Sequence, residues 1–306
     1  MKKTILITGV RGFLGSALWH FLTKNQNAFR VCGLARRRSQ AGNIFTCDLI
    51  HQAPLKSILA RIKPAYIFNF AGGRLGDDRR TMDANFETTN ILLNAVAGMG
   101  IRPRIIIPGS AAEYGNIQGK RLITENCLPQ PLGWYGFMKL LQTNLGLFYA
   151  RRGLDVVVAR MFNICGANTP PSLSLGGFAE QIVAIERGAR PVIKTKNLDG
   201  RRDFLDIEDI CRGLWMIAQK GQSGEVYNLC SGRPSCIREL LHRLLSHAQI
   251  KGIRVEENRQ DASLSFDAIG SNAKFKSIAP AWSARVRLEQ SIKNTLASYR
   301  RRPMPL

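Results

Sequence analysis

The sequence predicts an α/β fold, with a doubly wound parallel sheet followed by a smaller C-terminal α/β domain. In the first half, short apolar stretches alternate with longer amphipathic ones, the pattern of strands joined by crossover helices. A glycine-rich turn joins the first apolar stretch to the first helical one. Each crossover is long enough for a right-handed connection between parallel strands.

The expected elements follow the chain in strict alternation. Strands are expected at 4–8, 29–34, 65–70, 104–108 and 156–160, and helices at 12–24, 55–62, 81–99 and 134–151. Beyond about residue 165 the alternation loosens, and the segment GANTPPSLSLGG concentrates Gly, Pro and Ser. We therefore expect two partly interleaved domains, 1–165 and 166–306.

Composition indicates a globular protein of the cytoplasm. The 306 residues are 45% apolar and 22% charged, and no apolar run approaches the roughly 20 residues that span a bilayer. Seven cysteines are scattered without a CxxC pair, which is typical of reduced thiols in a cytosolic protein. No metal site is expected.

The formal net charge of +22 is unusual. It could reflect nucleic-acid binding, attraction to an anionic membrane, a site for polyphosphate substrates, or simply a solvated basic surface. The basic runs lack the interleaved aromatic residues of a single-strand binding groove. The charge alone leaves these alternatives open.

The glycine-rich turn has the order and context of a dinucleotide-binding loop. Its glycines permit a tight turn and close backbone approach to a pyrophosphate, which the amino end of the following helix would face. The predicted cofactor contacts in this loop are Gly9, Gly12, Phe13, Leu14 and Gly15.

The end of the second strand favours NADP(H) over NAD(H). Enzymes that use NAD usually carry an acidic residue there for the ribose 2′-hydroxyl, whereas this chain has Arg36 and Arg37. Guanidinium groups can pair with a 2′-phosphate. Further along, Asp48 and Leu49 would suit a contact to the adenine amine.

A phenol and an ammonium stand four residues apart at Tyr135 and Lys139, within a helical stretch. That spacing places both on one face of the helix, within reach of a common ligand. A neighbouring ammonium stabilises a phenolate, which helps tyrosine to exchange a proton near neutral pH. Ser110 lies upstream in PGSAAEYG.

Eight motifs in order resemble the extended short-chain dehydrogenase/reductase family of nucleotide-sugar enzymes, also called the NAD-dependent epimerase/dehydratase family. They are TGVRGFLG, FNFAGG, NFETTNILLNA, GSAAEYG, PLGWYGFMK, RMFNICG, RRDFLDIEDI and YNLCSG. The resemblance covers nearly the whole chain and implies a Rossmann domain and a nucleotide-sugar-binding domain. It implies a catalytic set of Ser110, Tyr135 and Lys139, of which the last two also contact the cofactor. It adds a cofactor contact at Ala71. The apolar rows at 91–96 and 140–148 are then either helix core or the faces through which two copies pair as a homodimer.

Within that family the chain looks most like the GDP-sugar branch, which holds GDP-mannose 4,6-dehydratases and GDP-4-keto-6-deoxy-mannose reductases. The segments VCGLARRRSQ, GGFAEQIVAIERG and KNLDGRRDF carry this likeness. By resemblance, substrate contacts are expected at Asn85, Asn163, Arg202 and Arg259. Gln260 departs from the usual proline after Arg259, and Arg202 could instead form a structural pair with Asp206.

One departure bears on the reaction. Dehydratases of this kind carry a glutamate where this chain has Ala112, and neither Ala112 nor Ala111 can move a proton. Glu113 should point the other way if the segment is extended. A reductase of a nucleotide-linked 4-keto-6-deoxy sugar is therefore favoured, and an epimerase with tightly bound NAD(P) is the alternative. A nucleic-acid-binding scaffold is disfavoured because the whole catalytic set is present.

Overall fold

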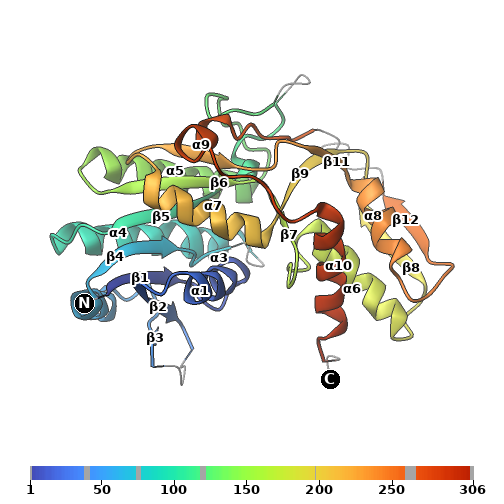
Figure 1. The fold of residues 1–306 in the computed structure, drawn as a ribbon, viewed down its shortest axis with the longest axis horizontal. Helices are drawn as coiled ribbons and strands as arrows, with labels where there is room; N and C mark the ends of the chain where they lie inside the picture. Colours follow the sequence, from blue (N-terminus) through green and yellow to red (C-terminus); the bar gives the residue numbers. More distant parts are fainter. Residues whose placement is uncertain are drawn as a thin grey trace.

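The computed structural model describes residues 2–37, 42–73, 77–117, 122–196, 198–258 and 267–303. A seven-stranded sheet forms its centre, in the order β10-β6-β5-β4-β1-β2-β3, and every neighbouring pair is parallel (Figure 1). The chain winds outward from β1 to β3, then crosses to β4 on the other side of β1. The strands are β1 Lys3–Thr8, β2 Phe29–Ala35, β3 Ile44–Thr46, β4 Pro64–Asn69, β5 Arg104–Ser110, β6 Val156–Met161 and β10 Val226–Leu229.

Helices cover both faces of this sheet. α1 and α7 contact each other over one face, where the larger apolar core lies. On the other face α4 contacts both α2 and α5 over a second core. Their bounds are α1 Phe13–Asn25, α2 Gln52–Ile62, α4 Thr88–Gly98, α5 Trp134–Arg151 and α7 Ile207–Lys220. The predicted doubly wound α/β fold is confirmed.

The helix expected at 81–99 is not continuous. It consists of α3 (Asp78–Met82), a π-helical turn (Asp83–Glu87) and α4. Inside the turn, the Asn85 amide donates to the carbonyls of Thr81 and Gly73, at 2.6 and 2.7 Å. Such a side chain competes with the regular backbone ladder, so the local sequence does not build an unbroken α-helix.

The chain beyond residue 165 builds a second unit and also returns to the first. A three-stranded sheet, in the order β11-β9-β7, and a parallel pair, β8 with β12, lie beside α6, α8 and α10 (Figure 1). β10 and α7 go back to the large sheet, and the short helix α9 packs near them. The bounds are β7 Asn163–Cys165, α6 Ser174–Glu186, β8 Val192–Lys196, β9 Arg201–Asp206, β11 Pro234–Cys236, α8 Ile237–Ser246, β12 Arg254–Asn258, α9 Ala273–Ile278 and α10 Leu288–Arg300.

Three further observations concern the described residues as a whole. None of their helices is long and apolar enough to cross a membrane. All seven cysteines lie among them, five of them buried, and none forms a disulfide. No group of three or more His, Cys, Asp or Glu within this part of the chain is placed to hold a metal ion.

Candidate active site

The glycine-rich turn fits a pyrophosphate because its backbone is packed too closely for side chains. A Cβ on Gly9, whose φ is +62°, would lie 2.4 Å from the Phe70 carbonyl oxygen, and one on Gly15 would lie 2.2 Å from the Gly9 carbonyl oxygen. Gly12 precedes α1, so the first N–H groups of that helix, from Phe13 and Leu14 onward, point toward the carboxyl edge of the sheet.

The predicted nucleotide-selecting residues lie beside this turn. Arg36 and Arg37 directly follow β2 and are exposed. Asp48 is half-buried just after β3, and its carboxylate accepts the Ile50 N–H at 3.4 Å. Leu49 is buried in the core beneath. These positions give two cations and one carboxylate at one end of the loop, where an adenosine 2′-phosphate would arrive.

Ser110 ends β5 and opens a 3₁₀ turn, Ala111–Glu113, instead of continuing the strand. Its Oγ accepts the Ala112 N–H at 3.2 Å, which leaves the hydroxyl proton free to be donated. Its own N–H donates to the Glu113 carboxylate at 2.6 Å. This reciprocal capping box fixes Ser110 at the carboxyl edge of the sheet.

Glu113 is turned into the protein. It is fully buried, and its second carboxylate oxygen lies 2.7 Å from an Arg160 guanidinium nitrogen. Arg160 also lies over the ring of Tyr114, 4.4 Å from the centroid, and burial raises the pKa of that phenol to about 12. Glu113 was expected to point away from the neighbouring Ala112 position through strand alternation. A 3₁₀ turn and a buried ion pair turn it inward instead.

Tyr135 and Lys139 both lie on α5, Tyr135 half-buried in its first turn and Lys139 buried one turn later. Gly136 lets this helix approach the Ser110 turn, since a Cβ there would lie 2.3 Å from the Ala112 carbonyl oxygen. The structure therefore brings the three predicted catalytic residues to the same edge, from β5 and from the amino end of α5. Burial lowers the pKa of Lys139 to about 8, and the nearby Glu113 carboxylate partly offsets this effect.

A chain of buried hydrogen bonds runs from Lys139 to the cofactor edge. The ammonium donates to Gln142 Oε1, and Gln142 Nε2 donates to Thr89 Oγ1 at 2.8 Å. Asn69 Nδ2 donates to the same oxygen at 2.9 Å and Asn69 Oδ1 accepts from Thr8 at 2.8 Å. Thr8 Oγ1 in turn accepts the N–H of Ala71, a predicted cofactor contact, at 2.9 Å.

Sequence reasoning missed these linking residues. Thr8 and Asn69 each end a buried strand of the sheet, which is a signal that could have revealed them. The contacts of Thr89 and Gln142 depend on how α4 packs against α5, and no local pattern encodes it.

Asn85 lies close to the site but its amide is occupied. It is 1% exposed, and besides its two donated bonds its Oδ1 accepts the Gly73 N–H at 3.1 Å. It holds Gly72 and Gly73, whose φ angles are +134° and +136°. A direct contact between Asn85 and substrate stays a prediction; both amide hydrogens are already donated, so the contact would be made by the Oδ1 atom.

The other predicted substrate residues come from the second unit. Asn163 opens β7 opposite Phe204 of β9, and donates to the Asp203 carbonyl at 3.0 Å. Arg202 lies on β9, two residues before Phe204, and is half-buried. Burial lowers the pKa of its guanidinium, and a phosphate beside it would raise that pKa again. Arg259 lies outside the described residues.

The alternative pairing of Arg202 with Asp206 does not suit this geometry. Four residues along a strand separate the two Cα atoms by about 13 Å. The Asp206 carboxylate instead accepts the Glu208 N–H at 2.8 Å and the Ser291 hydroxyl at 2.6 Å.

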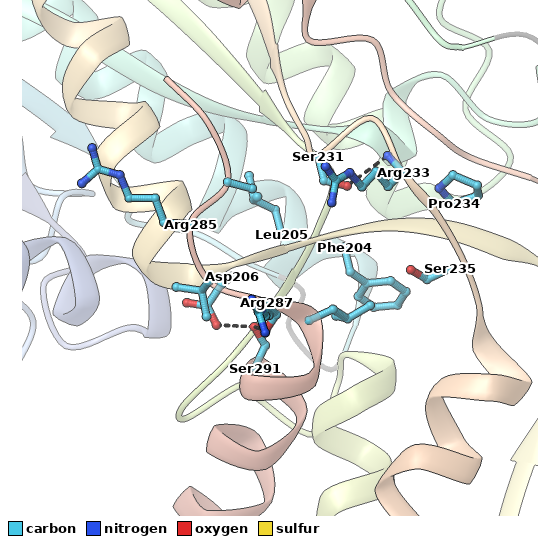
Figure 2. Close-up of a pocket in the computed structure, with 13 residues that line it drawn as sticks. Phe204, Leu205, Asp206, Ser231, Arg233, Pro234, Ser235, Arg285, Arg287 and Ser291 are labelled. Atoms are coloured by element: carbon cyan, nitrogen blue, oxygen red, sulfur yellow. Dashed lines mark hydrogen bonds between the residues drawn. The ribbon is translucent and has the colours of Figure 1, made fainter. Parts of the chain in front are cut away.

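A separate cavity of about 250 Å³ lies where β9 meets the start of α10 (Figure 2). Its lining includes Asp206, Arg233, Arg285 and Arg287 but none of the predicted catalytic residues. Figure 2 shows the Arg285 side chain extending away from Asp206, so the three arginines do not converge on one point.

The comparison with known proteins agrees with this arrangement. The model of the NAD dependent epimerase/dehydratase family matches residues 5–230. The chain belongs to this family. The match spans the glycine-rich turn, the Ser110 turn, the two predicted catalytic positions on α5, and β9.

One curated relative and two solved structures are similar to this chain along nearly its whole length. GDP-6-deoxy-D-mannose reductase of Pseudomonas aeruginosa is 26% identical over 99% of either chain. The structure of RMD from the same organism, complexed with NADPH, superposes with a TM-score of 0.86 at 25% identity, covering 98% of this chain and 100% of that one. A dTDP-glucose 4,6-dehydratase from Bacillus anthracis, in complex with NAD, shares the fold at a TM-score of 0.83 and 20% identity, over 97% and 96% of the two chains.

This membership establishes the protein as an enzyme of the extended short-chain dehydrogenase/reductase type with a Rossmann domain. Its relatives include reductases, dehydratases and epimerases of nucleotide sugars. The neighbouring structures hold NADPH in one case and NAD in another.

Proposed function

We propose that the protein is an NADPH-dependent reductase of a nucleotide-diphosphate-linked 4-keto-6-deoxy sugar, with a GDP-linked sugar favoured. The observation that carries this proposal is the inward turn of Glu113 into its ion pair with Arg160. With alanine at positions 111 and 112, the glutamate that a dehydratase carries there is absent, and the next carboxylate along the chain, Glu113, is held by Arg160. The similarity of the chain to the GDP-6-deoxy-D-mannose reductase of P. aeruginosa also supports a reductase.

The proposed reaction adds a hydride to the carbonyl carbon and a proton to its oxygen. NADPH, when bound, supplies the hydride and becomes NADP⁺. Tyr135 donates its phenolic proton to the oxygen, which becomes the new hydroxyl. The Ser110 hydroxyl donates a hydrogen bond that orients that oxygen, and Lys139 stabilises the phenolate left behind.

The other predicted site residues would bind the cofactor and the nucleotide part of the substrate. The turn at Gly9–Gly15 would bind the cofactor pyrophosphate through backbone N–H groups. Arg36 and Arg37 would bind the 2′-phosphate, and Asp48 the adenine amine. Asn163 and Arg202 would bind the substrate diphosphate.

Substrate assays test the reaction type directly. We expect NADPH consumption with GDP-4-keto-6-deoxy-mannose. We expect no conversion of GDP-mannose to a 4-keto-6-deoxy product with either cofactor, because moving Glu113 into the site would leave Arg160 buried without its counter-charge. Products are identified by mass spectrometry and NMR. A 4-keto-6-deoxy product from GDP-mannose without net NADPH use would overturn the proposal, and inversion at a sugar carbon without cofactor consumption would establish the epimerase alternative.

Cofactor choice is tested by calorimetry. We expect NADPH to bind at least about tenfold more tightly than NADH, a difference of about 1.4 kcal/mol. The Arg36→Asp variant should narrow or invert this gap, because it replaces a phosphate partner with a partner for the ribose hydroxyl. Arg30→Asp, an equal change of charge at the other end of β2, is the matched control and should leave the ratio unchanged. Equal affinities in the wild-type protein would refute the NADPH assignment.

We also propose a cytoplasmic homodimer paired through α4 and α5. Its support is the apolar surface of α5, where Trp134, Phe137 and Phe148 are 41%, 42% and 43% exposed. Exposed apolar surface that gathers on one helix is typical of a protein–protein contact.

A further inference from the structure

The amino edge of the large sheet carries a concentrated positive charge that the proposed reaction does not use. In parallel strands all amino ends lie at one edge, here the end away from β8 and β12 (Figure 1). Ten exposed cations lie at the starts of these strands, in the connections that lead into them, or in the helix turns just before those connections. They are Lys2, Lys3, Lys24, Arg30, Arg61, Lys63, Arg102, Arg151, Arg152 and Lys220.

Negative charge at this edge is already neutralised. In the same connections and helix turns, within the described residues, the acidic side chains are Asp155 and Glu225. Asp155 pairs with Arg104 at 2.8 Å and Glu225 with Lys274 at 2.6 Å. The ten cations therefore face solvent without a counter-charge from this part of the chain.

Helix dipoles account for only part of this charge. Lys24, Arg61, Arg151 and Lys220 lie in the last turns of α1, α2, α5 and α7, where a cation is favourable. The other six cations stand in connections or at strand starts. Of these six, Lys63 and Arg152 are the C-caps of α2 and α5, where the same dipole effect applies, and helix stability does not explain the other four.

The shape of the surface indicates the kind of partner. From β10 to β2 the edge crosses five strand spacings, about 24 Å. Cations also come from helices on both faces, α1 and α7 on one and α2 and α5 on the other, so the charge spreads in two dimensions. A planar anionic surface matches charge that spreads in two dimensions, whereas a nucleic-acid rod would contact only a strip of it.

We propose that this amino edge docks the enzyme onto an anionic lipid bilayer. Docking is electrostatic and peripheral, through Lys and Arg side chains and lipid phosphate groups. The candidate active site lies at the carboxyl edge of the same sheet, so it stays open to solvent when the opposite edge is bound.

Vesicle flotation with the full chain tests this docking. The probes are phosphatidylcholine vesicles alone and with about one third phosphatidylglycerol. We expect binding only to the anionic vesicles, and its loss at high salt. The edge variant, Lys3→Gln/Arg30→Gln/Lys63→Asn/Arg102→Gln, should bind at least about 30-fold more weakly. Asparagine is used at position 63 because φ is +42° there and asparagine tolerates that conformation.

The matched control removes four exposed cations from the second unit, in the variant Lys194→Gln/Arg243→Gln/Lys251→Gln/Arg254→Gln. It should bind anionic vesicles within about threefold of wild type, since it loses equal charge at another place. Melting temperature and NADPH affinity should stay unchanged in both variants. Failure of the wild type to bind anionic vesicles, or equal losses in both variants, would overturn the proposal. Edge-dependent binding of duplex DNA or RNA without vesicle binding would assign the surface to nucleic acid instead.

Discussion

Replacing Tyr135 with phenylalanine is expected to lower turnover by about 10²–10⁴-fold, the usual contribution of a positioned general acid. Only the phenolic hydroxyl is lost, so cofactor affinity and melting temperature should stay near wild type. Turnover is measured as NADPH oxidation with the 4-keto sugar.

The same helix offers a matched control for this change. Tyr149→Phe also removes one hydroxyl from α5, where the phenol donates to Asn94 at 2.5 Å, far along the helix from the site. It should retain turnover and lose only about 1 kcal/mol of stability, as expected for one hydrogen bond. Wild-type turnover by Tyr135→Phe would remove that residue from the mechanism.

Replacing Glu113 with alanine is expected to lower the free energy of unfolding by about 3–5 kcal/mol, because Arg160 would be left buried without its counter-charge. Glu113→Gln should lose less, since the amide oxygen can still accept from the Ser110 N–H. The double variant Glu113→Ala/Arg160→Met should recover part of the loss. Urea unfolding measures all three.

Asp155→Ala is the control for this series. Its carboxylate also pairs with an arginine, but it is 34% exposed, and such pairs contribute at most about 1 kcal/mol. If Glu113→Ala were no more destabilising than Asp155→Ala, the ion pair would not hold the Ser110 turn as described.

The sequence predicts the sheet well because its signals are local. Each of the five expected strands is an apolar run bounded by turn residues, and all five appear in the parallel sheet. The glycine-rich turn can also be predicted locally, because the backbone around Gly9 and Gly15 has no room for side chains and so requires glycine. Alternation alone does not find the three-residue strand β3, which is too short to show a pattern.

The site is less predictable because distant contacts set its electrostatics. Glu113 and Arg160 are 47 residues apart and Gln142 and Thr89 are 53 apart, and neither pair leaves a mark in the local sequence. The Arg202–Asp206 alternative failed for a related reason. Proximity in sequence is not proximity along an extended strand.

The buried chain from Lys139 to Ala71 has a further property, its polarity. A lysine ammonium can only donate, so Gln142 must present its oxygen to Lys139 and its NH₂ to Thr89. Asn69 is also oriented, because the Thr89 hydroxyl donates its proton to the Asn85 carbonyl at 2.6 Å and therefore accepts from Asn69 Nδ2. Replacing Asn69 with aspartate would keep the volume of the side chain but would disrupt the hydrogen-bonded chain. It would place a carboxylate oxygen against the Thr89 hydroxyl oxygen, which accepts a hydrogen bond at this point. The site is therefore encoded in the direction of its hydrogen bonds as well as in its shape.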